Sequence, residues 1–383
     1  MRSLIIICFF ITFSCGRKAD KKANSAVYPI DSKRDFLYNW PKKTSIKEVI
    51  YLESLDSTLI SHVEKIWISQ KDFSEIYVLD RKLKKIFIFN ATGEILSVFD
   101  KNGSGPGEYH EIRDAFLDFK NNEILILDNK RIKKYNLFTF EYLGSKDLNG
   151  IPGDNNFTRF IKIHDVYYLW TNIPPFQRPE LNFLQYDQRH HLVRLENNTI
   201  DFFIPYAYGV LNEIRFYPSV SGEDYYISPL TGKYDINKIS EKGVSKEYEF
   251  PIISKEIPEN LLMEMFYLED QFLASDYFKI LTNFRETNNL LYFNFIGPKA
   301  KVYHALFDKK EREFLTIGKS EEFVPQIIFA DADHFYSLIS PDVLLFLIKS
   351  KRITIENNTL LKEIDLKGFK TDDNPIIIKF SVD

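Results

Sequence analysis

A segment repeated at a fixed interval is the feature that most constrains this sequence. Glu75-Ile-Tyr-Val-Leu-Asp80 is followed, 48 residues later, by Glu123-Ile-Leu-Ile-Leu-Asp128. Each copy is an apolar strand that ends in Asp, and each leads into a short basic turn and two further strands. Repetition at this interval is typical of folds in which one antiparallel sheet is repeated around an axis. The repeat therefore predicts the blades of a β-propeller.

Weaker copies of the leading strand recur downstream at uneven intervals, which indicates loops of different lengths. They are placed at Asp165–Trp170, Glu223–Ser228, Leu290–Phe295 and Asp333–Ile339. The second strands of the same four units are expected at Asn182–Asp187, Tyr234–Ile239, Val302–Asp308 and Leu344–Lys349. The six leading strands predict an all-β fold, a six-bladed β-propeller over residues 45–383. One short helix is expected in a connection, over Pro258–Glu269, where a proline precedes good helix formers.

The end of the chain is expected to close the ring. After a polar loop, Asn374-Pro375 leads into the apolar strand Ile376–Val382. Ring closure commonly requires a strand from one terminus to join a blade begun at the other, because this removes exposed sheet edges. We therefore predict that Ile376–Val382 pairs with a strand near Ile46–Leu52.

The composition supports a strand-rich interior and excludes one class of partner. The 383 residues include 34 Phe and 22 Tyr but only 3 Met, and aromatic residues are enriched in strands. The net charge of −4 is spread along the chain, whereas nucleic-acid binding requires a basic patch or stripe. No nucleic-acid partner is expected.

The first residues have the composition of an export signal. Met1-Arg2 is basic, and Leu4–Phe13 is an apolar run of ten residues, about half the length that spans a bilayer. Ser14-Cys15-Gly16 follows and resembles a bacterial lipobox, although Thr12-Phe13 replaces the residues usual there. Residues 1–14 are therefore predicted to be a lipoprotein signal peptide and Cys15 to be lipidated. An ordinary secreted protein is the alternative.

Residues 15–44 are interpreted as the lipidated cysteine and a flexible tether to the membrane. The stretch from Gly16 to Ser25 is polar and basic, a composition typical of a flexible linker. Loss of Cys8 with the signal peptide and acylation of Cys15 would leave no thiol for a disulfide. Lipoproteins sent to the cell surface in some bacterial groups carry an acidic run here, which this tether lacks. We therefore expect an outer-membrane protein of the cell envelope, with the periplasmic side favoured over the cell surface.

A glycine-rich turn separates the two strong copies of the repeat. Its residues are Gly103, Gly105, Pro106, Gly107, Glu108 and Tyr109. Glycine and proline at these positions favour one compact turn. A phosphate-binding loop is the alternative, but such a loop leads directly into a helix, whereas Tyr109 leads into another predicted strand. The segment is interpreted as a structural turn between blades.

Together these motifs resemble a family of bacterial lipoproteins that form six-bladed β-propellers, related to NHL-repeat propellers. The resemblance depends on the two Asp-ended strands, on the turn that ends at Tyr109, and on Asp373-Asn-Pro-Ile-Ile377 near the C-terminus. It is sharpest over residues 60–145 and at the tail. It implies the propeller fold and a place in the cell envelope, but no activity and no site residue.

No catalytic or metal-binding constellation is found in the sequence. His190 and His191 are the only adjacent histidines, and neighbours on a strand point to opposite faces, so they are not expected to share a zinc ion. The nucleophile motif Gly-x-Ser-x-Gly is absent. Calcium is left open, with acidic candidates at Asp114, Asp118, Asp128 and Asp154. Aspartates at strand ends more commonly cap turns, so no cofactor and no catalytic residue are predicted.

The candidate binding surface is the axial face of the propeller, where loops and first strands converge. Charged residues that fall before or at the start of a proposed blade are Arg113, Asp114, Arg159, Arg215 and Arg285. Arginines around a funnel suit carboxylate or sugar-acid ligands. Ion pairs between blades are the alternative role for these residues.

The predicted function is that of a non-catalytic envelope lipoprotein, a monomer that binds a glycan, a peptide or a protein on its propeller. A hydrolase or lyase with its site in the axial pocket is the alternative, because a fold does not decide activity. A role in the assembly of outer-membrane proteins is a third hypothesis.

Overall fold

The structure is a computed structural model that describes most of the predicted propeller. The described residues are 26–30, 44–69, 74–151, 157–171, 190–197, 199–205, 214–228, 234–252, 257–258, 261, 274–319 and 323–382. The predicted signal peptide, Cys15, Asp154, the strand expected over Asn182–Asp187 and most of the helix expected over Pro258–Glu269 lie outside these ranges.

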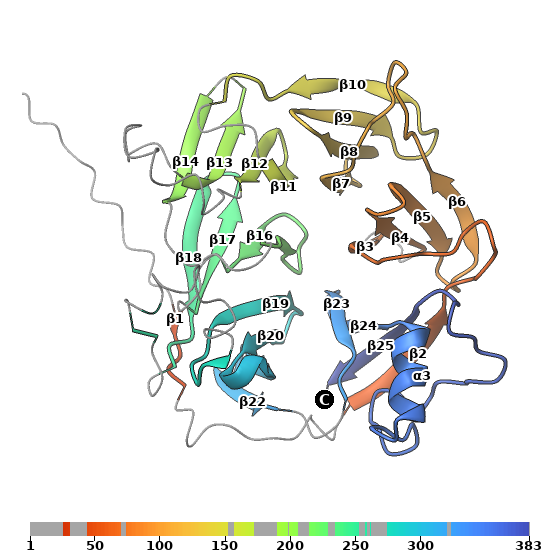
Figure 1. The fold of residues 1–383 in the computed structure, drawn as a ribbon. Helices are drawn as coiled ribbons and strands as arrows, with labels where there is room; N and C mark the ends of the chain where they lie inside the picture. Colours follow the sequence, from red (N-terminus) through yellow and green to blue (C-terminus); the bar gives the residue numbers. More distant parts are fainter. Residues whose placement is uncertain are drawn as a thin grey trace, which may run out of the picture.

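Six sheets form a ring, antiparallel except for one short strand at the edge of blade 4, and each has the first strand of its blade nearest the centre (Figure 1). Blade 1 comprises β3 (Lys65–Ile68), β4 (Glu75–Asp80), β5 (Lys85–Asn90) and β6 (Ile95–Phe99). Blade 2 comprises β7 (Asp114–Asp118), β8 (Glu123–Asp128), β9 (Arg131–Asn136) and β10 (Tyr142–Asp147). Blade 3 comprises β11 (Phe157–Ile163), β12 (Val166–Thr171), β13 (His190–Glu196) and β14 (Thr199–Pro205).

The second half of the ring contains both chain ends. Blade 4 comprises β15 (Tyr217–Pro218), β16 (Tyr225–Ile227), β17 (Asp235–Ser240), β18 (Gly243–Glu249) and, at its outer edge, β1 (Ala26–Val27). Blade 5 comprises β19 (Ile280–Glu286), β20 (Leu290–Ile296), β21 (Val302–Asp308) and β22 (Glu313–Gly318). Blade 6 comprises β23 (Gln326–Ala330), β24 (Phe335–Ile339), β25 (Ile376–Val382) and β2 (Thr44–Tyr51). The prediction of an all-β, six-bladed propeller is confirmed.

The position of the predicted leading strands within each blade was wrong by one strand. Glu75–Asp80 and Glu123–Asp128 are β4 and β8, the second strands of their sheets, and the four weaker copies fall on β12, β16, β20 and β24. The inner strands were not recognised in the sequence because their residues do not alternate between apolar and polar. All five residues of β7 are buried, for example, and β15 is only two residues long.

A second expectation was also wrong. Leu344–Lys349 is not a strand but the end of helix α3 (Pro341–Lys349), which lies between β24 and β25. Proline in the first turn, together with Asp342, favours a helix start, and the strand beside β24 is β25. Within the described ranges, no helix is both long and apolar enough to span a membrane.

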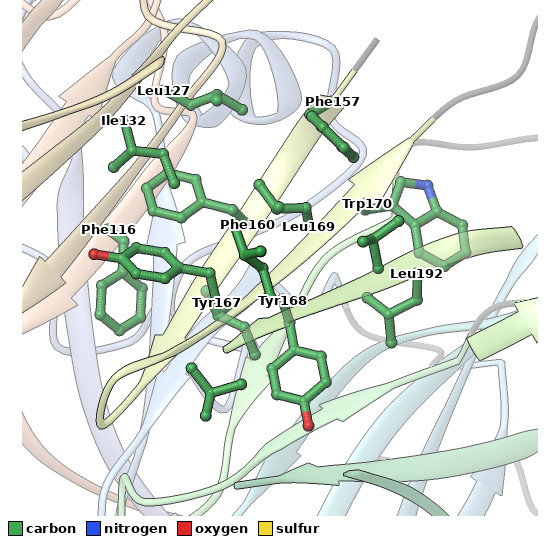
Figure 2. Close-up of a cluster of buried hydrophobic side chains, with 14 of the residues drawn as sticks. Phe116, Leu127, Ile132, Phe157, Phe160, Tyr167, Tyr168, Leu169, Trp170 and Leu192 are labelled. Carbon is green, nitrogen blue, oxygen red and sulfur yellow. The ribbon is translucent and has the colours of Figure 1, made fainter. Parts of the chain in front are cut away.

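The core consists of apolar layers shared by neighbouring blades. Figure 2 shows one such layer, in which Phe116 of β7 lies beside Phe160 of β11, with ring centroids 6.2 Å apart. Leu127 of blade 2 and Trp170 of blade 3 belong to the same cluster, and both are completely buried. Burial of apolar surface at about 25 cal/mol per Å² therefore stabilises the contact between blades as well as each sheet.

The C-terminal strand closes the ring as predicted. β25 pairs antiparallel with β24 on one side and with β2 on the other, where Ile50 lies opposite Ile377. Ile376, Ile377 and Ile378 are completely buried. The sixth blade is thus assembled from both ends of the chain.

Asn374, directly before this strand, joins the C-terminal segment to the N-terminal one. Its Oδ1 accepts a hydrogen bond from the Ile60 backbone amide at 2.7 Å, and its Nδ2 donates to the carbonyl oxygens of Glu53 and Thr58 at 2.7 and 3.0 Å. Its own amide donates to the Ser54 hydroxyl at 2.7 Å. The side chain is 2% exposed, so water cannot replace these bonds.

Asn374→Ala should destabilise the protein by about 2–4 kcal/mol, because it leaves one buried amide and two carbonyl groups without partners. The free energy of unfolding from urea titration is the measurement. Exposed Asn357 supplies the matched control, and Asn357→Ala should change the value by about 0.5 kcal/mol or less. Equal stability of the two variants would contradict this role for Asn374.

Candidate functional site

The centre of the ring holds a cavity of about 430 Å³. Every blade contributes its inner strand to the wall, with representatives Ile66, Phe116, Ile163, Tyr217, Arg285 and Ile328. Residues of the turns after β7, β11 and β15 also line it, among them Phe119, His164 and Gly222. The cavity therefore extends to the end of the ring at which the inner strands finish.

Most of the wall is apolar, with several aromatic rings. Trp67, Phe119, Phe216, Tyr225 and Phe329 come from four different blades. A volume of this size, with an apolar wall and a few polar groups, is typical of sites for small organic ligands. The charged groups in the wall therefore decide what such a ligand can be.

Two wall acids are neutralised by lysines. Lys162 Nζ lies 2.7 Å from Asp118 Oδ2 and 3.1 Å from Glu123 Oε2. Burial favours the neutral acid at Asp118, but hydrogen bonds from Lys162 and Asn121 outweigh it and hold the pKa of Asp118 below its usual value. Glu286 is similarly paired, with its Oε1 2.8 Å from the Nζ of Lys309.

A third wall acid, Glu64, belongs to an ion-pair network between blades 1, 2 and 3. Arg159 Nη2 lies 2.7 Å from Glu64 Oε1, and Arg159 Nη1 donates to the Arg113 carbonyl oxygen at 3.2 Å. Asp114 lies between two cations, with Oδ1 2.5 Å from Lys65 Nζ and 3.8 Å from Arg159 Nη1. Arg159 and Asp114 are 1% and 0% exposed.

The five candidate axial residues therefore fall into different environments. Asp114 and Arg159 lie between blades, outside the cavity wall, in the network described above. Arg113 Nε pairs with Glu111 Oε1 at 2.7 Å, in a partly exposed position. Arg215 and Arg285 both line the cavity.

Arg285 is a buried cation. It is 7% exposed, its Nη1 donates to the Phe284 carbonyl oxygen at 2.6 Å, and its guanidinium lies 4.9 Å from the centroid of the Tyr217 ring. No described carboxylate lies within 4 Å of Arg285 or of half-buried Arg215. Burial lowers the pKa of Arg285 to about 10, and the positive charge of Arg215 acts in the same direction.

The three candidate calcium ligands within the described residues, Asp114, Asp118 and Asp128, each have another role. Asp128 Oδ2 lies 2.8 Å from Lys133 Nζ, and its carboxylate also accepts backbone hydrogen bonds from His110 and Glu111. Asp114 and Asp118 are paired with lysines as described. Within the described part of the chain, no three His, Cys, Asp or Glu side chains are grouped as a metal site would need.

The glycine-rich turn links β6 to β7. Glu108 Oε2 accepts a hydrogen bond from the Gly105 amide at 2.7 Å, and a Cβ at Gly103 would collide with the same carboxylate. Tyr109 is completely buried and donates to the Lys84 carbonyl oxygen at 2.7 Å. These contacts hold the turn against blade 1.

Sequence reasoning named Arg159 and Asp118 but missed their partners Glu64 and Lys162. It also missed the pair of Glu286 with Lys309. Glu64 and Arg159 lie 95 positions apart, and Asp118 and Lys162 lie 44 apart. No local pattern relates residues at such distances, because only the ring brings their strands together. Glu286 is the last residue of an inner strand, so it would have been a candidate if the inner strands had been recognised in the sequence.

The fold and the cavity together define a six-bladed β-propeller with an axial site of ligand size. Residues 44–381 match the family described as a domain of unknown function (DUF4934), and the chain belongs to that family. None of the curated proteins compared with the chain matches it significantly.

Among the solved structures that are similar to this chain, two have the same fold over most of their length. A protein described as exported, from Bacteroides fragilis, is 17% identical with a TM-score of 0.71, over 94% of this chain and 100% of the other. A member of a second family, DUF4221, from Bacteroides vulgatus, is 11% identical with a TM-score of 0.59, over 90% and 100% of the two chains. At these identities the likeness concerns the fold alone.

Arg159→Met should destabilise the protein by about 3–5 kcal/mol, because it removes the cation 2.7 Å from the buried carboxylate of Glu64. Urea unfolding followed by tryptophan fluorescence measures the change. The double variant Glu64→Gln/Arg159→Met should recover part of the loss. As the control, Arg113→Gln removes a partly exposed ion pair and should cost about 1 kcal/mol or less. A single Arg159 variant as stable as the Arg113 variant would contradict the network's structural role.

Proposed function

We propose that this protein is an exported, lipid-anchored binding protein that holds a small ligand in the axial cavity of its propeller, without catalysis. The observation that carries the proposal is the cavity itself, whose apolar wall includes a buried arginine with no described acid partner. A polar group held in an apolar cavity is the arrangement that fixes the orientation of a bound ligand.

The charge state of the wall acids favours binding over hydrolysis. Glu64, Asp118 and Glu286 are each paired with a cation. A general acid needs a raised pKa so that it holds a proton at neutral pH, whereas the pKa of Asp118 is lowered. These acids are suited to hold the wall together, and proton transfer would require their ion pairs to break.

The location in the cell envelope is supported by the first residues of the chain. The short apolar run before Ser14-Cys15-Gly16 is typical of an export signal with a lipidation site. The relative from Bacteroides fragilis, which shares the fold, is itself described as exported. We propose anchorage through Cys15 to the outer membrane, on its periplasmic side.

Cys15→Ala should abolish lipid attachment, while Cys8→Ala, within the predicted signal peptide, should leave it intact. Incorporation of labelled palmitate and partition into a detergent phase measure attachment in cells that make the full chain. We expect the wild type and the Cys8 variant in the detergent phase. Label retained in the Cys15 variant, or absent from the wild type, would refute lipidation at this residue.

Ala330→Trp should abolish ligand binding, because Ala330 lies in the cavity wall on β23 and an indole there would fill the space. The measurement is the thermal shift produced by a panel of sugars, sugar acids, amino acids and small carboxylates. At least one compound should stabilise the wild type in a saturable way. Ala91→Trp, in the turn after β5, is the control and should bind as the wild type does. Binding retained by Ala330→Trp would place the site elsewhere.

A further inference from the structure

Arg285 is the group in the cavity that the rest of the fold does not explain. Two other buried cations near the axis have acid partners at short distance, Lys162 in Asp118 and Arg159 in Glu64. The described residues offer Arg285 only a backbone carbonyl oxygen and the Tyr217 ring. Removing a charge from water is unfavourable unless a partner compensates it, and the described residues leave this positive charge without a compensating acid.

Arg285 lines the cavity, and the contacts of its guanidinium leave one nitrogen without a described acceptor. Nη1 is bound to the Phe284 carbonyl oxygen, and Nε is enclosed without a hydrogen-bond partner. Nη2 is the remaining nitrogen, and no described atom accepts a hydrogen bond from it. The Tyr217 ring lies against the guanidinium and restricts its position. A donor held in place without a described acceptor is suited to an acceptor atom of a ligand.

Arg215 adds a second positive charge beside the first. It lines the same cavity and is half-buried, and no described side chain pairs with it. Two like charges close together destabilise each other, unless an anion lies near both. Three of the four acids in the described wall are already paired. The fourth, Glu223, is exposed and forms no described ion pair with either arginine.

We propose that the ligand of the axial cavity is a small organic carboxylate with an apolar or aromatic body, whose carboxylate binds Arg285 and Arg215. The proposal rests on the proposed function and names the ligand class of that same site. Carboxylate is the anion that arginine binds with defined geometry. Rings such as Phe116 and Tyr225, with centroids 6.0 Å apart, offer an apolar surface to the body of the ligand.

Inorganic phosphate and phosphate esters fit this cavity less well. Phosphate is commonly bound by backbone amides at a helix N-terminus or in a glycine-rich loop, and the described wall is built from strands and hairpin turns. The wall acid Glu286 lies directly after Arg285 in β19, and a dianion would be repelled by it more strongly than a monoanion. Phosphate therefore serves as a competing outcome in the test.

Calorimetric titration of the purified propeller at constant ionic strength tests the proposal. The probes are acetate, hexanoate, benzoate, indole-3-acetate and glucuronate, with benzamide and glucose as neutral counterparts and inorganic phosphate as the competing anion. We expect at least one carboxylate to bind, its neutral counterpart to bind about tenfold more weakly or not at all, and Arg285→Met to weaken the carboxylate by about tenfold or more. Arg113→Met, which removes an arginine outside the cavity, should bind as the wild type does.

A second measurement needs no ligand. Arg285→Met removes an uncompensated buried charge and keeps most of the side-chain volume, so the free variant should melt at a higher temperature than the free wild type. If Arg285 had a structural role, the melting temperature of the variant would fall instead, and that result would overturn the proposal. Equal carboxylate binding by the wild type and Arg285→Met, or a preference for phosphate, would also overturn it.

The outcomes separate the ligand class from the binding function. If a neutral compound binds, is blocked by Ala330→Trp and is unaffected by Arg285→Met, the binding function stands and the carboxylate assignment falls. If no compound of any charge binds, the binding function itself falls.

Discussion

The pairing of β25 with β2 is the constraint on which the whole ring depends. Five blades are each built from one continuous stretch of chain, apart from the short addition of β1 to blade 4, whereas blade 6 needs three strands from the C-terminal region and one from the N-terminal region. Its ladder joins residues more than 300 positions apart, such as Thr44 and Val382. Contacts of such high sequence separation form against a large loss of chain entropy. Asn374 offsets part of that loss by bonding three backbone groups of the N-terminal segment.

Once closed, the ring uses polar and apolar contacts for different purposes. Apolar layers fill the space between sheets, as around Phe160 and Trp170. In such layers one apolar side chain can replace another of similar volume at little cost in stability. Ion pairs such as Arg159 with Glu64 are directional, and they fix how the inner strands of three blades meet. The axial cavity is the space enclosed by these strands. Its wall contains acids that are paired with cations, together with one buried arginine for which no described acid is a partner.

The sequence was sufficient to predict the architecture because the fold repeats a local pattern. β4 and β8 are short buried strands with a shared terminal aspartate, and the apolar run over Ile376–Val382 marks the closing strand. The inner strands could not be recognised, since a fully buried strand such as β7 has no alternation. This error also affected the site. Arg159 and Arg285 were both selected as residues near a blade start, yet one lies early in an inner strand, between blades, and the other at the cavity end of its strand. Only the arrangement of the blades separates these two environments.

The short strand β1 gives the N-terminal segment a second attachment to the ring. It runs parallel to β18 at the edge of blade 4, and Ile30 beyond it is completely buried and bonded to the Pro251 carbonyl oxygen. Because β1 precedes β2 along the chain, mechanical tension that enters through the N-terminus loads blade 4 first. The hydrogen bonds of Tyr28 and Ile30 to blade 4 would have to break before tension reached the longer ladder between β2 and β25.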